Sequence, residues 1–243
     1  MALNDLKYES PKTTKLAVEL LSREGEVPFI FAGGTDLLVQ MSDEVIEPTL
    51  LVDIKKIHET REIVINDDQI RIGAAVTGVE LGECKELKMM WPGIVEAVEL
   101  IGSNQIQGRA TIGGNLCNAS PAADSVPALI SARAKIEIAG PSGLHEIPVE
   151  DLPLGPGKTS LAREEFVTAI VLNKPVKGSG DAYLRFIPRT EMDIAVVGAG
   201  MSVVLDSEGN CLRTWLALGA VSPTAILVEK ISKILVGQKL DLQ

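Results

Sequence analysis

The stretch RATIGGNLCNASPAADSVP, residues 109–127, decides how the rest of this chain is interpreted. It holds a glycine pair, Gly113-Gly114, between two small polar residues, Thr111 and Asn115. Glycines adopt positive φ angles readily and let a ligand approach the main chain closely. Successive amides in such a turn can also converge on an anion. We therefore expect a ligand-binding turn at this glycine pair.

The same stretch continues with a helix signal. Ser120-Pro121 combines a serine N-cap with proline at the first helical position, so we expect a helix from Ser120 to about Ser131. Asp124 would lie in its first turn, where it can accept a hydrogen bond from a sugar hydroxyl. The alternative is a plain helix-start aspartate favoured by the helix dipole.

A similar segment, FIFAGGTDLL, lies upstream at residues 29–38. One glycine pair alone is equally well read as a strand-to-helix turn that needs glycine. Two pairs with polar neighbours indicate a bound diphosphate instead. Thr111 and Asn115 are the side chains that can hydrogen-bond phosphate or ribityl oxygens.

Composition narrows the class of protein. The 243 residues carry 33 acidic and 23 basic side chains, a net charge of −10, which disfavours a general nucleic-acid or anionic-membrane surface. The three cysteines form no CxxC pair, so the pattern predicts neither a local zinc site nor an iron–sulfur cluster. The N-terminus lacks signal-peptide features, and the apolar run 194–205 is too short to span a bilayer. We expect a cytoplasmic protein.

The order of elements predicts two regions. Helix, strand, turn, helix and strand follow one another over residues 11–54, which favours an α/β arrangement. Hairpins are expected at 63–74 and 135–149, and a late strand at 166–172. Residues 174–180 are the best linker candidate. Beyond it, three extended segments and an amphipathic helix from Pro223 to Leu235 predict a smaller domain.

The remaining motifs give little indication of a further ligand or metal site. Gly198-Ala199-Gly200 resembles the opening of a dinucleotide fingerprint, but Val203 stands at the third glycine position and no helix follows. We interpret it as a central strand with glycines at a bulge or close contact. His58 and His145 have no partner at metal-ligand spacing. The chain offers no acid–base machinery of its own, so we predict no catalytic and no metal-binding residues.

Taken together, these motifs resemble those of the FAD-binding medium subunit of the molybdenum hydroxylases, the group of xanthine dehydrogenase and aerobic carbon monoxide dehydrogenase. The anchors are AGGTDL at 32–37, TIGGN at 111–115, ASPAAD at 119–124 and RTEMDIA at 189–195. The resemblance extends over nearly the whole chain. It implies an α+β fold: a two-subdomain FAD-binding domain of the vanillyl-alcohol-oxidase (PCMH) type, followed by a small C-terminal α/β domain with an antiparallel sheet.

The resemblance also implies domain bounds and cofactor contacts. It places the FAD-binding domain at 1–175, with subdomains of about 1–57 and 58–175, and the C-terminal domain at 176–243. Relatives continue beyond Gln243, so this domain is expected to be shorter than theirs. Arg185 matches a position that is lysine in some relatives, which keeps the charge but changes the geometry. The expected cofactor-binding residues are Ile30, Phe31, Ala32, Gly33, Gly34, Thr35, Asp36, Leu37, Ile101, Thr111, Ile112, Gly113, Gly114, Asn115, Asp124, Val167 and Arg185.

The implied role is electron transfer through noncovalent FAD. The resemblance implies that a small subunit carries two-iron two-sulfur clusters and a large subunit the molybdenum cofactor, in a dimer of heterotrimers. The FAD would pass electrons to NAD, oxygen or a quinone. Two alternatives stay open: a stand-alone FAD-dependent oxidase or reductase of the same superfold, and an assembly scaffold that has lost its flavin.

Overall fold

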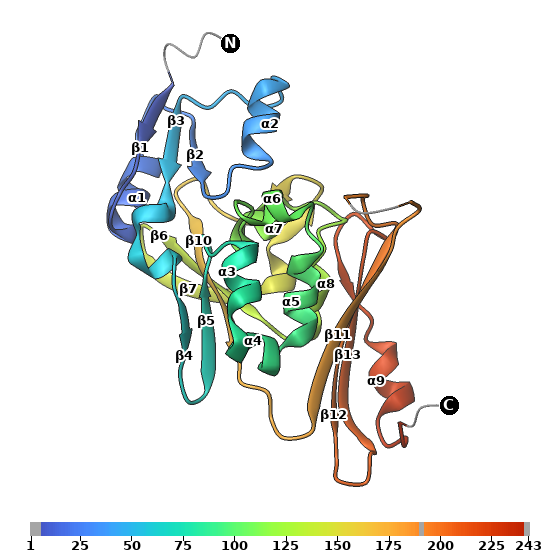
Figure 1. Cartoon of the computed structure of the whole chain (residues 1–243). Coiled ribbons are helices and arrows are strands. Elements are labelled where there is room, and N and C mark those ends of the chain that lie inside the picture. The colour runs from blue at the N-terminus through green and yellow to red at the C-terminus, as the bar shows by residue number, and fades with distance from the viewer. Residues whose placement is uncertain (1–5, 190–191, 241–243) are drawn as a thin grey trace.

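The computed structural model describes residues 6–189 and 192–240. Three sheets succeed one another along the molecule, with a layer of helices between the second and the third (Figure 1). Thr190 and Glu191 of the RTEMDIA anchor lie outside the described residues, as do the first five residues and 241–243. Within the described part, no helix is long and apolar enough to cross a membrane.

The first sheet is small and parallel, in the order β1-β3-β2. Its strands are β1 (Lys7–Glu9), β2 (Pro28–Phe31) and β3 (Leu50–Asp53). Helix α1 (Thr14–Leu21) packs on this sheet, and the short helix α2 (Leu37–Ser42) follows β2. Strand β3 is buried along its whole length, so the core of this unit forms around it.

The second sheet is antiparallel, in the order β4-β5-β10-β6-β7. Its strands are β4 (Ile63–Ile65), β5 (Gln69–Gly73), β6 (Lys135–Gly140), β7 (Gly143–Pro148) and β10 (Phe166–Asn173). Both expected hairpins are present, and β10 lies between them. Seven of the eight residues of β10 are buried, as a central strand covered on both faces requires. Strands β8 (Pro153–Gly155) and β9 (Lys158–Thr159) form a separate two-stranded ribbon.

A layer of short helices covers the second sheet and forms the larger core with it (Figure 1). Its members are α3 (Gly78–Glu83), α4 (Lys85–Met90), α5 (Pro92–Glu99), α6 (Asn104–Gln107), α7 (Ile112–Cys117) and α8 (Ser125–Ser131). Thr77 caps α3 through a complete capping box with Glu80. Helix α8 is buried at all seven positions, because it also contacts the third sheet.

The third sheet is antiparallel, in the order β11-β12-β13-β14, and α9 (Lys230–Leu235) packs on β13. Its strands are β11 (Ser179–Phe186), β12 (Val197–Leu205), β13 (Cys211–Gly219) and β14 (Ile226–Leu227). Gly198 and Gly200 lie in β12, and a Cβ atom at Gly200 would stand 2.5 Å from the Pro127 backbone. The interpretation of this motif as a strand in close contact, not a dinucleotide site, is therefore confirmed.

Several local predictions were wrong in detail. Residues 121 and 122 lie in a turn that the Ala123 amide closes on the Ser120 carbonyl, and α8 begins only at Ser125, with Asp124 as its N-cap. The C-terminal helix begins at Lys230, because residues 226 and 227 pair with β13 as a strand. Strand β1 was not anticipated, since its three residues are all exposed and carry no apolar pattern.

Candidate functional site

The two glycine-containing segments meet directly. A Cβ atom on Gly33 would lie 2.2 Å from the carbonyl oxygen of Arg109, so the first segment touches the backbone that leads into the second. Such an approach is possible only without a side chain. The glycine pairs therefore build one site from elements about 80 residues apart in the sequence.

The first segment, residues 32–36, presents unbonded backbone amides. In the described part of the chain, no acceptor bonds the amides of Gly33, Gly34, Thr35 or Asp36. Gly34 has φ = +78°, the left-handed conformation that a nest of amides uses. This segment has the geometry and the free donors to hold an anionic group.

The charged side chain of Lys55 contacts the first segment and stabilises it. The Lys55 ammonium donates to the Ala32 carbonyl at 2.8 Å, pairs with Asp53 at 2.8 Å and lies 4.0 Å from the centre of the Phe31 ring. Burial alone would raise the pKa of Asp53, but hydrogen bonds from Lys55 and Tyr8 outweigh it, and the pKa is lowered. The carboxylate thus stays ionised and holds Lys55 against the loop.

The second segment differs from the expected turn. Gly113 and Gly114 lie in the first turns of α7, and neither has positive φ. The amides of Ile112, Gly113 and Gly114 bond to Val76, Ala74 and Thr111. A Cβ atom on Gly113 would stand 2.6 Å from the Ala74 carbonyl oxygen, so glycine is needed here for close packing. Of the two glycine pairs, both of which lie in the described part of the chain, the first has unbonded amides and a positive φ, and the second has neither.

Asn115 is the side chain of the second segment that is best placed for a ligand. Its carboxamide oxygen accepts a hydrogen bond from the Ser125 hydroxyl at 2.6 Å, which leaves its amino group available. Ser125 is fully buried and was not anticipated, because serine at a helix start has a common structural role.

Asp124 lies at the junction between the helical layer and the third sheet. Its Oδ1 accepts from the Tyr183 hydroxyl at 2.8 Å, and its Oδ2 from Arg185 Nη1 at 3.1 Å. Arg185 also donates to the Leu100 carbonyl at 2.9 Å. Burial raises the pKa of Asp124, and the Tyr183 and Arg185 hydrogen bonds oppose that rise. The family resemblance implied Asp124 and Arg185 as cofactor contacts, but not Tyr183.

One cavity of about 740 Å³ joins these groups, a volume in the usual range for cofactor sites. Fifteen of the seventeen expected cofactor-binding residues line it. Phe31 and Ile112 do not: Phe31 contacts Lys55 and Tyr8, and Ile112 is fully buried in the core. Residues that line the cavity without having been expected include Gln40, Ile106, Cys117, Asn118, Glu165, Met192, Asp193 and Ile194.

The cavity suits a flavin dinucleotide on its own terms. The unbonded amides of the first segment match a diphosphate, and the Asp124 carboxylate matches a sugar or ribityl hydroxyl. Burial raises the pKa of the Cys117 thiol to about 12, so it remains protonated and is a poor nucleophile. This condition agrees with noncovalent binding.

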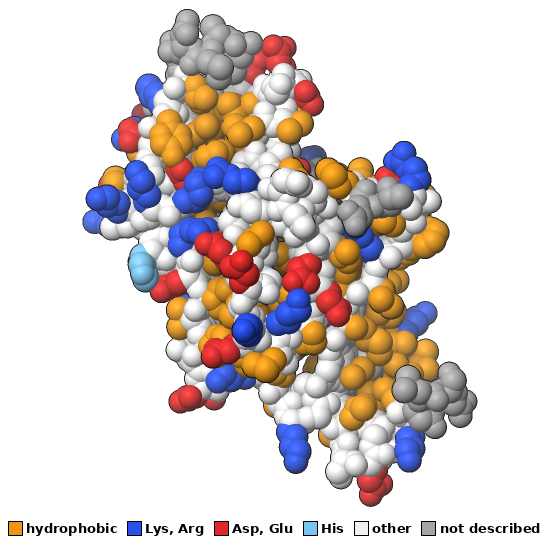
Figure 2. Space-filling model, viewed as in Figure 1, with side chains coloured by type: hydrophobic (Ala, Val, Ile, Leu, Met, Phe, Trp, Pro, Cys, Tyr) orange, Lys and Arg blue, Asp and Glu red, His pale blue; other side chains and the backbone are white. Residues whose placement is uncertain are grey.

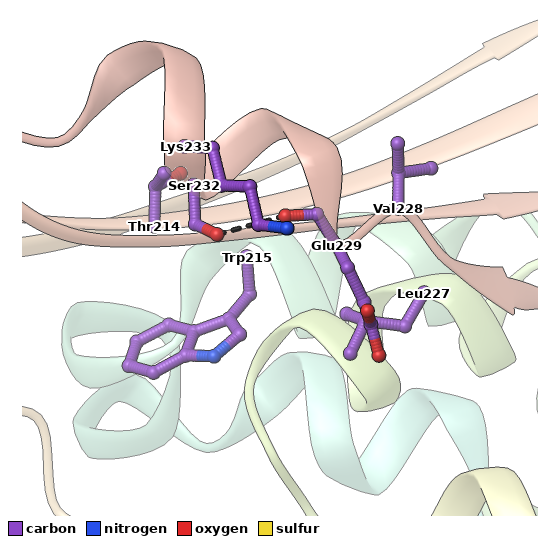
Figure 3. A pocket seen from close by; sticks show the side chains of 7 residues that line it. All are labelled: Thr214, Trp215, Leu227, Val228, Glu229, Ser232 and Lys233. Atoms are coloured by element: carbon purple, nitrogen blue, oxygen red, sulfur yellow. Dashed lines mark hydrogen bonds between the residues drawn. The ribbon is translucent and has the colours of Figure 1, made fainter.

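A second cavity, of about 260 Å³, lies between α9 and β13 (Figure 3). It is lined by Thr214, Trp215, Leu227, Val228, Glu229, Ser232 and Lys233, and the Ser232 hydroxyl donates to the Glu229 carbonyl at 2.8 Å. It contains none of the expected residues. His58 and His145 lie on the surface, and the described residues include no group of three metal ligands.

Comparison with known proteins covers both regions of the chain. Residues 4–175 match the FAD-binding domain in molybdopterin dehydrogenase, and residues 182–243 match the carbon monoxide dehydrogenase flavoprotein C-terminal domain. The nicotinate dehydrogenase FAD-subunit of Eubacterium barkeri is 30% identical over 99% of this chain and 83% of that protein. The xanthine dehydrogenase FAD-binding subunit of Escherichia coli O157:H7 is 32% identical over 97% of this chain and 81% of that protein.

The fold agrees with the sequence comparison. Reconstituted carbon monoxide dehydrogenase from Oligotropha carboxidovorans superposes with a TM-score of 0.92 and 31% identity, covering 99% of this chain and 84% of that one. The expected α+β fold, with an FAD-binding domain followed by a domain with an antiparallel sheet, is confirmed. The chain therefore belongs to the FAD-binding subunits of the molybdenum hydroxylase family of oxidoreductases.

Proposed function

We propose that the 740 Å³ cavity holds noncovalent FAD and that this chain is the electron-transfer subunit of a molybdenum hydroxylase. The observation that carries the proposal is the meeting of the unbonded first-segment amides with Asp124 and Arg185 around one cavity. The domain division that we propose follows the sheets, with an FAD-binding domain at 1–175 in two subdomains and a C-terminal domain at 176–243.

Each group has a task in this proposal. The amides of residues 33–36 bind the diphosphate, and the Asn115 amino group supplies a further donor. Asp124 accepts a hydrogen bond from the sugar portion, while Arg185 adds positive charge. The apolar side chains of Ile101 and Val167 exclude water from the cavity wall. FAD, when bound, would supply the redox chemistry, and the residues of this chain would hold and orient it.

The proposed partners are an iron–sulfur subunit that delivers electrons and a large subunit with the molybdenum cofactor, in a dimer of heterotrimers. NAD, oxygen or a quinone would accept the electrons. Apolar exposure near the cavity supports a partner surface there: α2 contributes Leu37 to the cavity wall, while Leu38 and Val39 are 50% and 55% exposed. Figure 2 shows apolar side chains gathered at the end of the molecule that carries α2 and the first sheet.

The first test of the proposal is flavin uptake. The apoprotein should bind added FAD, acquire a flavin absorption spectrum and release free flavin on acid precipitation. Gly34→Ala should abolish uptake, because Gly34 has φ = +78° and a Cβ atom there would lie 2.4 Å from the Phe31 ring. Gly143→Ala is the matched control: Gly143 has φ = +104° at a hairpin tip, with nothing within 4 Å. Equal uptake by the two variants would exclude this cavity as the FAD site.

The second test concerns the partners. Affinity capture of the tagged full chain from its native host, followed by mass spectrometry, should recover an iron–sulfur protein and a molybdenum-cofactor protein. Recovery of the chain alone, with turnover of a substrate by the isolated flavoprotein, would favour the stand-alone oxidase or reductase.

A further inference from the structure

Strand β11 carries three polar side chains on the face that meets the helical layer. Asp181, Tyr183 and Arg185 alternate with exposed residues along the strand, as the two-residue period of a strand requires. The Asp181 carboxylate lies against the start of α5, where a Cβ atom on Gly93 would stand 2.6 Å from Asp181 Oδ2. Tyr183 and Arg185 both bind Asp124. One strand of the third sheet thus contacts the helical layer at successive inward positions.

Tyr183 is the most buried of the three, with 3% of its surface exposed. Its hydroxyl donates to Asp124 Oδ1 at 2.8 Å, and Gly198 on the neighbouring strand leaves the space for that hydroxyl. A Cβ atom at Gly198 would stand 2.4 Å from the Tyr183 oxygen. Gly198, the first glycine of the sequence that resembles a dinucleotide fingerprint, therefore makes room for a tyrosine that reaches Asp124, and Asp124 lines the cavity.

The two contacts divide the Asp124 carboxylate between them. Oδ1 accepts from Tyr183 and Oδ2 from Arg185, so the plane of the carboxylate is held at both oxygens. Each carboxylate oxygen can accept more than one hydrogen bond, which leaves capacity for a cofactor hydroxyl. Arg185 contributes a positive charge to the contact, whereas the neutral Tyr183 hydroxyl orients the Asp124 carboxylate without adding charge.

We propose that Tyr183 is a positioning residue of the flavin site, which holds the Asp124 carboxylate in the orientation that the cofactor meets. The C-terminal sheet then takes part in cofactor binding through a residue that does not line the cavity. This inference rests on the proposed FAD site, and it adds a residue to that site.

The inference predicts a specific pH dependence. Burial raises the pKa of Asp124, and within the described chain Tyr183 and Arg185 are the titratable groups that oppose that rise. Loss of the Tyr183 hydroxyl removes a donor to the charged carboxylate, so the pKa of Asp124 should rise further. FAD affinity should then begin to fall at a higher pH than in the wild type, as protonation costs Asp124 its charge.

The test is FAD titration of the apoprotein by flavin fluorescence quenching, between about pH 5 and pH 8. For Tyr183→Phe we expect an FAD dissociation constant about fivefold to tenfold higher at neutral pH, and a low-pH loss of affinity displaced to higher pH. Ser202→Ala is the matched control, because the Ser202 hydroxyl donates to the Ser131 carbonyl across the same interface without touching Asp124. Its pH profile should remain that of the wild type.

Three outcomes separate the possibilities. A Tyr183→Phe profile that coincides with the wild type overturns the inference. An equal displacement in Ser202→Ala also overturns it, because a loss of general packing across the interface would then explain both. Failure of the wild-type apoprotein to bind FAD refutes the proposed site itself. Thermal unfolding of both apo variants identifies any difference that arises from folding.

Discussion

Replacement of Gly33 by alanine tests whether the two glycine segments form one site. The added Cβ atom would lie 2.2 Å from the Arg109 carbonyl oxygen, 3.0 Å from the Arg109 carbonyl carbon and 3.1 Å from the Ala110 Cα. Since non-bonded heavy atoms rest at about 3.5 Å, the two backbones must separate by more than about 1 Å. Both neighbours are main chain, so no side-chain rotation can relieve the contact.

That separation should affect binding more than folding. A displacement of about 1 Å in a binding constellation can cost on the order of 100-fold, which corresponds to about 2.8 kcal/mol of FAD binding free energy. Overpacking should lower the free energy of unfolding of the apoprotein by about 1–3 kcal/mol. FAD binding to Gly33→Ala should therefore weaken by roughly two orders of magnitude.

The assay is FAD titration of apoprotein combined with urea unfolding. Gly180→Ala serves as the control, because Gly180 lies in β11 with ordinary φ and nothing within 4 Å of its added Cβ. It should bind FAD like the wild type. A Gly33→Ala protein that folds and binds FAD within about twofold of the wild type (0.4 kcal/mol or so) would refute the argument that this contact positions the site.

Three further predictions concern charge and the thiol. Burial raises the pKa of Asp181 to about 6 in the folded protein, whereas the pKa of an unfolded aspartate is about 3.9. The folded state therefore keeps this proton to a higher pH than the unfolded state. As a result, the free energy of unfolding should fall between about pH 4 and pH 6, by about 1–2 kcal/mol after solvent screening. Asp181→Asn should flatten that slope in urea midpoints measured across this range, and an unchanged slope would contradict the assignment. Lys55→Met removes the bond to the Ala32 carbonyl and the cationic partner of Asp53, so FAD affinity should fall about tenfold. Lys56→Met, at an exposed neighbour, should leave the titration unchanged. Cys117→Ser should still take up FAD and release it on acid precipitation, and loss of uptake in a folded variant would revise the noncovalent assignment.

The parts of the fold that follow from short stretches of sequence were predicted well. The hairpins β4–β5 and β6–β7 have a polar or glycine-containing turn between two apolar runs, so their pairing is local. The position of β10 between them was not predictable, because its partners lie about 30 and 100 residues away. A sequence pattern can identify a buried strand, but it does not indicate which other strands pair with it.

In the functional site, too, local features were predicted from the sequence and contacts between distant residues were not. The two glycine pairs were predicted to be ligand-binding segments, and the structure places one cavity where both meet. Their physical roles could not be separated from sequence, because a glycine that supplies positive φ looks the same as one that permits close packing. Tyr183 was missed for a related reason: it is 59 residues from Asp124, and an alternating strand tyrosine usually indicates core packing.

The distinction between the glycine pairs bears on how an acidic protein can hold an anionic cofactor. At a net charge of −10 the protein as a whole repels a diphosphate, but at physiological ionic strength that repulsion is screened over about 8 Å. What remains is local: uncharged amides at residues 33–36 and the Lys55 ammonium that supports them. Because these donors are fixed by backbone conformation, their orientation does not depend on surface charge. The Asp124 carboxylate would oppose an anion, and its buried contact with Arg185 compensates that charge where the cavity needs an acceptor. In the proposed site, the first glycine pair would thus supply the attraction, and the second keeps the neighbouring elements close together.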